Sequence, residues 1–525
     1  MRDRMVLSFV LNAHLPFIRE NEPGGAEERR LFEHICETYL PLLELCDRLE
    51  EDHVPFRLAF SLSPALCHML NDELLKERFH DYMDHRIRFG EAELCRGSGS
   101  SGEQELARCF LERMTRRRAF YEKRCGADIP GVFREFQAKG RIELLGSAAT
   151  GAFLPFYSEL PEAVQAQFEI ALASHRSFFE KNPQGFWLPE LGWSPELDEY
   201  LRSYNLSYTI VNPHALFTGT PQALNGNFYP VKTPRGTLIL GRDFNVYRDF
   251  WNEEDGLVHD PGYLDIRRDA GYELPFEHLY SYLKSCRGRS ATGYTYWAKN
   301  GGLYDPLLAG QKAAAAAKLF LERRIAQLSA ARELIGGQCI SLNACNAGEF
   351  GFHWREGPAF LEALFRESAR NRQVQFMNPL EYLYTQDTAS YQTMMPEFSS
   401  WGVNGYAESW LDASNDWIYR HIFRSLERMR ELADRFPENS GLKERTLNQA
   451  AREILLVQEA AWPKMMGGGE NMRYARCQIE NSLRNFTTIY ESLGSNYIST
   501  EWLTSLEKRN NIFPDINYRV FRKKR

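Results

Sequence analysis

The chain has no run of about 18 consecutive apolar residues, the length that a membrane-spanning helix requires. Its 10 cysteines are scattered singly and form no CxxC pair, which argues against a structural zinc site and against a disulfide framework. Positive charge is not in excess, because 63 Lys and Arg stand against 70 Asp and Glu. We therefore expect a cytoplasmic protein that binds neither membranes nor nucleic acid and holds no metal.

Aromatic residues, by contrast, are plentiful. The 525 residues include 34 Phe, 25 Tyr and 10 Trp. Flat rings cover the apolar faces of sugars in carbohydrate sites, but a large hydrophobic core uses the same residues. The positions of the rings must therefore decide between the two uses.

Short apolar runs alternate with amphipathic stretches over residues 1–385. This alternation predicts parallel strands joined by crossover helices. We expect an α/β fold with a distorted (β/α)7 TIM-like barrel. The candidate strands are Met5–Leu11, Phe56–Ser61, Ile142–Leu145, Phe186–Leu188, Leu206–Val211, Leu238–Leu240, Cys339–Leu342 and Val374–Met377.

Two regions depart from the alternation. Residues from about 73 to 137 have helical periodicity around a loop rich in glycine and serine at 96–102, which predicts a helical insertion in the barrel. From about Asp416 onward the pattern is helical and nearly free of strands, over Asp416–Phe436, Lys443–Ala461 and Asn471–Leu493. The sequence thus predicts a barrel domain at 1–385 and an α-helical C-terminal domain at 386–525 that completes the cleft.

Several predicted strands end in polar residues. The run at Phe186–Leu188 ends in Pro189 and Glu190, and other strands run into His14, His214 and Asn346. The carboxyl ends of barrel strands converge on one face, where barrel enzymes place their chemistry. A fixed carboxylate such as Glu190 suits attack on the anomeric carbon of a sugar. The plain alternative is a strand-end glutamate paired with a nearby arginine.

Five segments follow one another in a characteristic order. They are VLNAHLPF at 10–17, GSAATGAFLP at 146–155, FWLPELGW at 186–193, NAGEFGFHWREGP at 346–358 and SSWGVNGYAESWLDASNDW at 399–417. Together they make the chain resemble glycoside hydrolase family 57, which contains α-amylases, 4-α-glucanotransferases and 1,4-α-glucan branching enzymes. The resemblance runs from residue 6 to about residue 490 and is closest to the branching-enzyme-like members.

The resemblance implies a retaining mechanism with two carboxyl groups about 5–5.5 Å apart and no cofactor. One carboxylate forms a glycosyl-enzyme, and the other protonates the leaving oxygen and then deprotonates the acceptor. The expected substrate is an α-glucan or a maltooligosaccharide. Glu190 falls on the family nucleophile, whereas the family acid/base falls on Asn346, which has no proton to give.

Other polar positions of the family pattern are changed as well. They are Asn12, Gly151, Ala316, Gly348, Phe352 and Ala461, while the glycines, prolines and tryptophans of the scaffold persist. This pattern predicts a degenerate active site with weak or absent activity. Glu349 is the candidate substitute acid; alternatively, it is a solvated loop carboxylate or a partner of Arg355. Asp412 and Asp416 are weaker candidates.

Two other functions stay open at this point. The chain could be a non-catalytic carbohydrate-binding or regulatory pseudoenzyme, or a partner-binding protein without a sugar ligand. For each candidate sugar contact, the alternative is core packing or a satisfied structural residue. The candidates are His14, Trp187, His214, Arg242, Trp251, Trp354, Trp401, Trp410 and Trp462. Hydrolysis versus transfer, the length of the glucan and the oligomeric state are not determined by the sequence.

Overall fold

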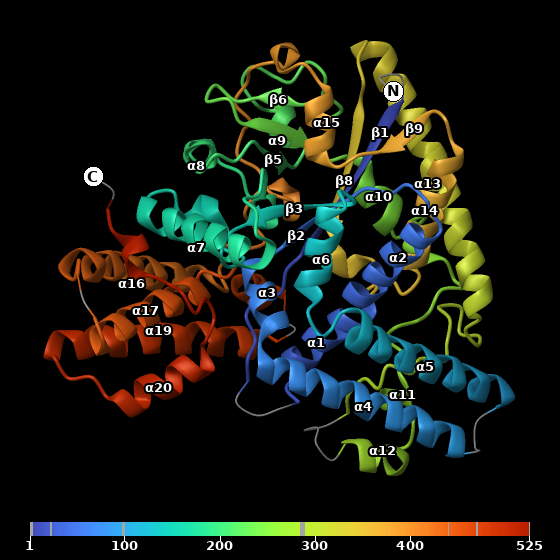
Figure 1. Cartoon of the computed structure of the whole chain (residues 1–525), viewed down its shortest axis with the longest axis horizontal. Helices are drawn as coiled ribbons and strands as arrows, with labels where there is room; N and C mark the ends of the chain where they lie inside the picture. Colours follow the sequence, from blue (N-terminus) through green and yellow to red (C-terminus); the bar gives the residue numbers. More distant parts are fainter. Residues whose placement is uncertain are drawn as a thin grey trace.

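The computed structural model describes residues 4–20, 24–96, 100–283, 289–438, 440–468 and 471–523. Within these residues, nine strands form one sheet in the order β6-β7-β5-β4-β3-β2-β1-β8, with β9 paired to β1 (Figure 1). The strands are β1 (Met5–Ala13), β2 (Leu58–Leu62), β3 (Ile142–Ser147), β4 (Gly185–Trp187), β5 (Tyr208–Val211), β6 (Val231–Lys232), β7 (Leu238–Gly241), β8 (Ile340–Asn346) and β9 (Val374–Phe376).

Strand β1 pairs with three other strands and is buried along its whole length. One edge of β1 pairs with β8, from Val6 opposite Ile340 to Asn12 opposite Asn346. Its other edge pairs with β9 at its start and with β2 at its end. These pairs are parallel, as are all the others except β6 with β7. Both faces of such a sheet are buried, which explains the continuous apolar runs.

The sheet curls so that its two ends approach each other. The backbone N–H of Asp243, just after β7, donates to the carbonyl of Leu342 in β8, with N and O 2.7 Å apart. The predicted distorted barrel and its eight predicted strands are confirmed. Strand β6 was not predicted, because two residues are too few to produce a periodic signal.

Helices wrap around the curled sheet. They are α1 (Ala26–His34), α2 (Leu40–Glu51), α3 (Pro64–Asn71), α4 (Glu73–Arg96), α5 (Ser101–Ala119), α6 (Ile129–Ala138), α7 (Pro161–Phe179), α8 (Leu197–Ser203), α9 (His214–Phe217), α10 (Asn245–Trp251), α11 (Ala270–Glu273), α12 (Phe276–Leu283), α13 (Pro306–Ile335), α14 (Gly357–Arg370) and α15 (Pro379–Thr385). Helices α4, α5 and α6 form the predicted insertion; part of its glycine- and serine-rich loop, residues 97–99, lies outside the described residues.

The C-terminal region is helical, as predicted. Its helices are α16 (Asp416–Arg435), α17 (Leu442–Val457), α18 (Ala461–Gly468), α19 (Met472–Ser495) and α20 (Thr500–Arg509), and α16, α17, α19 and α20 gather on one side of the molecule (Figure 1). The division into two domains at residue 385 stays a prediction. In the part of the chain that the structure describes, no helix combines the length and apolar character needed to cross a membrane.

Candidate active site

A cavity of about 370 Å³ opens where β1 and β8 end. It brings together four residues that the sequence singled out from distant segments: His14, Glu190, Asn346 and Glu349. Its wall also contains Asn12, Leu15, Pro16, Ile18, Glu27, Arg30, His34, Tyr39, Gly348, His353, Ala461, Lys464, Met465, Gly468 and Asn471. The predicted convergence of strand ends therefore holds for these four residues.

Glu190 lies in a 3-10 turn, η4 (Pro189–Leu191), directly after β4. Its φ of 58° and that of Leu191, 49°, are in the left-handed region that favours glycine, and such strain is concentrated at functional sites. The Trp401 indole N–H donates to Glu190 Oε2 at 2.6 Å, and Lys464 Nζ lies 3.8 Å from the same oxygen. The side chain is 19% exposed, so Glu190 is held in place yet reachable from the cavity.

Asn346 occupies the last position of β8 and is exposed to the cavity. It sits directly opposite Asn12 in the β1–β8 register, and Asn12 Nδ2 donates to Asn346 Oδ1 at 3.1 Å. Two of the positions at which the sequence is expected to depart from the family pattern thus form one amide pair. Neither amide can act as a general acid at ordinary pH.

Glu349 ends the 3-10 turn η6 (Ala347–Glu349) that follows β8, and it faces the cavity. Burial raises the pKa of its carboxyl to about 7, although Arg242, Cys345 and Trp251 beside it favour the ionised form. A carboxyl with a pKa near 7 suits general acid–base catalysis at neutral pH. The alternative pairing with Arg355 is wrong, because Arg355 donates to the Gly351 carbonyl and lies 3.7 Å from Glu37.

His14 is fixed by two partners on either side of its ring. Nδ1 lies 2.8 Å from Ser63 Oγ, and Nε2 lies 3.2 Å from Oε1 of the buried Glu459. Burial lowers the pKa of His14, but the carboxylates of Glu459 and Glu190 more than offset it, so the net shift is upward. The imidazolium form places a positive charge beside Glu190.

Glu459 is anchored in turn by the backbone around it. Its carboxylate accepts hydrogen bonds from the N–H groups of Gly151, at 2.9 Å, and Ala461, at 3.2 Å. Burial raises the pKa of Glu459, but His14 and these N–H groups lower it by more, so the net shift is downward. A Cβ at residue 151 would lie 2.3 Å from Glu459 Oε1 and 2.4 Å from His14 Nε2, so only glycine leaves both side chains in these positions.

Three of the predicted sugar contacts support the two carboxyl groups. Trp187 is buried behind Trp401, with the rings edge to face at 5.3 Å, so it supports Trp401 rather than lining the cavity. The Arg242 guanidinium lies 5.5 Å from the Trp401 ring and also beside Glu349. Trp251 hydrogen-bonds Glu349. These contacts orient Glu190 and Glu349.

The other predicted contacts lie away from the cavity wall. Trp354 packs among phenylalanines in the main core, and Trp410 stacks on Phe153 at 4.6 Å. The Trp462 indole donates to the Leu456 carbonyl, also in the core. His214 lies 5.3 Å from the Tyr406 ring, and burial lowers its pKa. These side chains pack in the scaffold because burial, not cleft geometry, governs their positions.

Sequence reasoning missed several wall or support residues, among them Arg30, His34, Glu459 and Lys464. Their only sequence signal is a polar residue on the apolar side of a helical pattern, as at His34, which is 6% exposed. Glu459 is separated from His14 by 445 positions, and no local pattern predicts such a contact.

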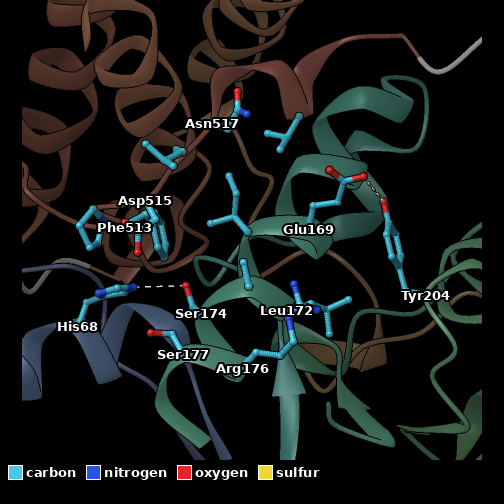
Figure 2. Close-up of a pocket in the computed structure, with 15 residues that line it drawn as sticks. His68, Glu169, Leu172, Ser174, Arg176, Ser177, Tyr204, Phe513, Asp515 and Asn517 are labelled. Carbon is cyan, nitrogen blue, oxygen red and sulfur yellow. Dashed lines mark hydrogen bonds between the residues drawn. The ribbon is translucent and has the colours of Figure 1, made fainter. Parts of the chain in front are cut away.

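A second cavity of about 410 Å³ lies between α3, α7 and the C-terminal segment 513–520 (Figure 2). His68 Nε2 lies 3.3 Å from Ser174 Oγ, and the Tyr204 hydroxyl donates to Glu169 at 3.0 Å. Burial lowers the pKa of His68 to about 4, so this imidazole is neutral. These polar groups pair with one another in the wall, and the cavity holds none of the strand-end residues. Among the described residues, no group of three or more His, Cys, Asp or Glu could hold a metal ion.

Comparisons with known proteins agree with the motifs. The family profile described as glycosyl hydrolase family 57 matches residues 8–253, and the profile described as 1,4-alpha-glucan branching enzyme, C-terminal, matches residues 421–521. A 1,4-alpha-glucan branching enzyme of Thermococcus kodakarensis is 26% identical, and the alignment covers 97% of this chain and 77% of that enzyme.

Solved structures extend the likeness to the whole chain. The GH57-type branching enzyme of Pyrococcus horikoshii, 24% identical, shares the fold with a TM-score of 0.89 over 99% of this chain and 97% of that one. The novel alpha-amylase AmyC of Thermotoga maritima is 30% identical, with a TM-score of 0.93 over 99% of this chain and 100% of that one. The similarity predicted from the five segments is thereby confirmed, and the chain belongs to glycoside hydrolase family 57, with the C-terminal region of its branching enzymes.

Proposed function

We propose that the protein is a retaining α-glucan-active enzyme of the branching-enzyme type, with Glu190 as nucleophile and Glu349 as acid/base. One observation supports this assignment above all: the same cavity holds the fixed carboxylate of Glu190 and a Glu349 carboxyl with a pKa of about 7. Retaining enzymes need such a pair, one group ionised and the other able to carry a proton at neutral pH.

In the first step, Glu349 gives its proton to the glycosidic oxygen of the glucan. The bond from that oxygen to the anomeric carbon breaks, the fragment on the leaving side departs, and a Glu190 carboxylate oxygen bonds to the carbon. Trp401 and Lys464 both contact Oε2, so we assign Oε1 as the attacking atom. The pKa of His14 is raised in part by Glu190, and the protonated imidazole stabilises the ionised carboxylate before attack.

In the second step, a hydroxyl oxygen attacks the same carbon. Glu349, now ionised, takes the hydroxyl proton, and the bond to Glu190 breaks. A sugar hydroxyl gives transfer or branching, and water gives hydrolysis. Asn346 stands at the strand end where the resemblance expects the acid/base, and its amide cannot donate the proton. Glu349 in the following turn donates it instead, from a different position, and we propose that turnover is therefore slow.

One observation favours a second function, non-catalytic glucan binding. The Asn12–Asn346 pair places two amides at the strand ends, where they can hydrogen-bond sugar hydroxyls without transferring a proton. In that case Glu190 would serve as a hydrogen-bond acceptor. The two functions differ in turnover and in their response to Glu349.

Incubation with amylose and maltooligosaccharides, with analysis of chain lengths and branch points, separates the two functions. We expect measurable turnover by the unaltered protein, a loss of roughly 10³-fold or more in Glu190→Gln, and a loss of about 10² to 10⁴ in Glu349→Gln. Glu408→Gln changes an exposed glutamate outside the cavity and serves as the control. Tight maltooligosaccharide binding without turnover would instead establish the binding protein.

The Asn346→Asp variant addresses the source of the proton. If Glu349 is the acid, a new carboxyl at residue 346 adds less than about tenfold to the rate, because the catalytic proton already has a donor. A much larger gain would contradict the assignment of Glu349 and show that the strand-end acid alone was missing.

A further inference from the structure

Helix α1 does not continue directly into α2. It ends at His34, and the π-helical turn η1 (Ile35–Tyr39) follows before α2 begins. A π turn aligns residues five apart, and the rings of His34 and Tyr39 are 6.2 Å apart. Both residues line the cavity that holds Glu190. The irregular turn therefore presents His34 to the cavity, and such turns are frequent at functional sites.

The imidazole of His34 is buried but has no hydrogen-bond partner. It is 6% exposed, and within the described part of the chain neither ring nitrogen is hydrogen-bonded. The ring is held flat against Phe352, with centroids 4.2 Å apart and planes 14° apart. A buried polar group without a partner is unfavourable, so the site fits a ligand that satisfies both nitrogens.

The charge state of His34 indicates which ligand fits. Burial, followed by the charges of Arg30, His353 and Arg355, lowers the pKa of His34 well below its ordinary value. A neutral imidazole has one donor nitrogen and one acceptor nitrogen. A hydroxyl both donates and accepts, whereas an anion only accepts. The acidic Glu27 in the same wall also disfavours an anion.

Arg30 extends this part of the wall. It lies one helical turn before His34 on the same face of α1, and it also lines the cavity. Its Nε–H group is buried and has no hydrogen-bond acceptor among the described residues. Its guanidinium carbon lies 5.9 Å from the centroid of the Phe352 ring. The phenyl ring of Phe352 therefore positions both His34 and Arg30, and together they offer donors and one acceptor to hydroxyl groups.

His34 and Arg30 lie on the Glu349 side of the cavity, and this position indicates which part of the glucan they contact. A Cβ at Gly348 would lie 2.6 Å from His34 Cε1, so His34 contacts the residue next to Glu349. The acid/base faces the leaving fragment first and the acceptor afterwards. We propose that His34 and Arg30 form the subsite that binds the glucosyl unit of the leaving and acceptor chains. The inference rests on the proposed function, because it takes Glu349 as the acid/base.

Binding tests this subsite without turnover. In a Glu190→Gln background, maltohexaose titrated by calorimetry should bind about tenfold more weakly when His34→Phe is added. Phenylalanine keeps the stack on Phe352 and removes both nitrogens. Arg30→Met, which keeps the aliphatic stem, gives a second variant if His34→Phe lowers the melting temperature. His80→Phe on α4, outside the cavity, is the matched control and should bind as the background does.

Turnover gives the second readout. In the otherwise unaltered protein, His34→Phe should lower the ratio of transfer to hydrolysis about tenfold, because water needs no subsite. Unchanged affinity and an unchanged ratio in both variants would overturn the inference while leaving the proposed function intact. Weakened binding in a protein without turnover would refute the proposed function and, with it, the assignment to leaving and acceptor chains, and would leave His34 and Arg30 as a glucan-binding site only. Failure of the background protein to bind maltohexaose would overturn the subsite.

Discussion

Gly151 and Gly348 each leave space that another polar side chain uses, and Asn346 pairs with a second amide. Glu459 and His14 occupy the space beside Gly151, and His34 occupies the space beside Gly348. Asn346 pairs with Asn12 across the β1–β8 register. Read position by position, the sequence indicates that polar groups are lost from the cleft. The structure places others there, from α1 and from the segment before α18.

Glu349 supports a prediction on stability at the residue scale. Burial raises its pKa from 4.5 to about 7, so the folded state binds more protons than the unfolded state between these values. The penalty for ionising Glu349 is absent below pH 4.5, grows as the pH rises to about 7, and is fully present above it. Glu349→Gln should therefore raise the free energy of unfolding at pH 8 by about 1–3 kcal/mol.

Urea unfolding at pH 4 and pH 8 measures this difference, with Glu408→Gln as the control. At pH 4 the variant and the parent should agree, because Glu349 is protonated in both states. Equal or lower stability of Glu349→Gln at pH 8 would show that the carboxyl is not desolvated. The same variant should lose activity while gaining stability, as expected of a group that serves catalysis at a cost to folding.

At the scale of elements, local patterns predicted the strands but not the irregular turns. Strands such as β1 and β8 are continuous apolar runs, which the sequence displays directly. The π turn η1 has no such signal. Its Glu37 is 1% exposed and pairs with Arg117 from α5, at 2.6 Å, so distant contacts determine that turn. The same applies to the left-handed conformation of Glu190, which follows from its bonds to Trp401.

Helix α13 is tied to the closing edge of the sheet through Arg324. This residue is 2% exposed; its Nη2 lies 2.7 Å from Asp249 in α10, and its Nε lies 3.6 Å from Asp243 after β7. Asp243 is thus paired with a helix of the barrel, not with its neighbour Arg242. Removing Arg324 would leave two buried carboxylates without their main cation, which typically costs about 3–5 kcal/mol.

Arg324→Met should therefore lower the free energy of unfolding by about 3–5 kcal/mol in thermal or urea melts. The matched control is Arg323→Met on the same helix. Arg323 is 35% exposed and lies 3.2 Å from the same Asp249, and partly exposed pairs contribute less than about 1 kcal/mol. If both variants lose the same stability, the buried pairing does not brace the sheet edge.

At the scale of the whole molecule, residues from both ends of the chain line the cavity that holds Glu190. Asn12 and His14 come from β1, whereas Ala461, Lys464, Met465 and Asn471 come from the helical C-terminal region. Composition and periodicity predicted that a helical region follows the barrel. They could not predict which of its residues reach the strand ends, because those contacts join positions hundreds of residues apart and depend on the final packing.

Buried contacts cross from the helical region to the barrel at several points. Glu459 holds His14, the Thr150 hydroxyl donates to the Leu455 carbonyl at 3.0 Å, and Gln167 donates to Gln458 at 3.1 Å. All of these groups except His14 are buried, so separating the two regions would expose unpaired polar atoms as well as apolar surface. We therefore expect the barrel and the C-terminal helices to unfold in one cooperative transition.

Three probes followed on heating test this expectation: helical circular dichroism, tryptophan fluorescence and maltohexaose binding. If folding is cooperative, the three transitions coincide, because the cavity exists only while β1 and α18 are both in place. Calorimetric and van't Hoff enthalpies should then agree. An early loss of helical signal, with the tryptophan signal of the barrel still native, would contradict this and favour two independently folding domains divided near residue 385. Loss of binding in that first step would still assign the cavity wall to the C-terminal helices.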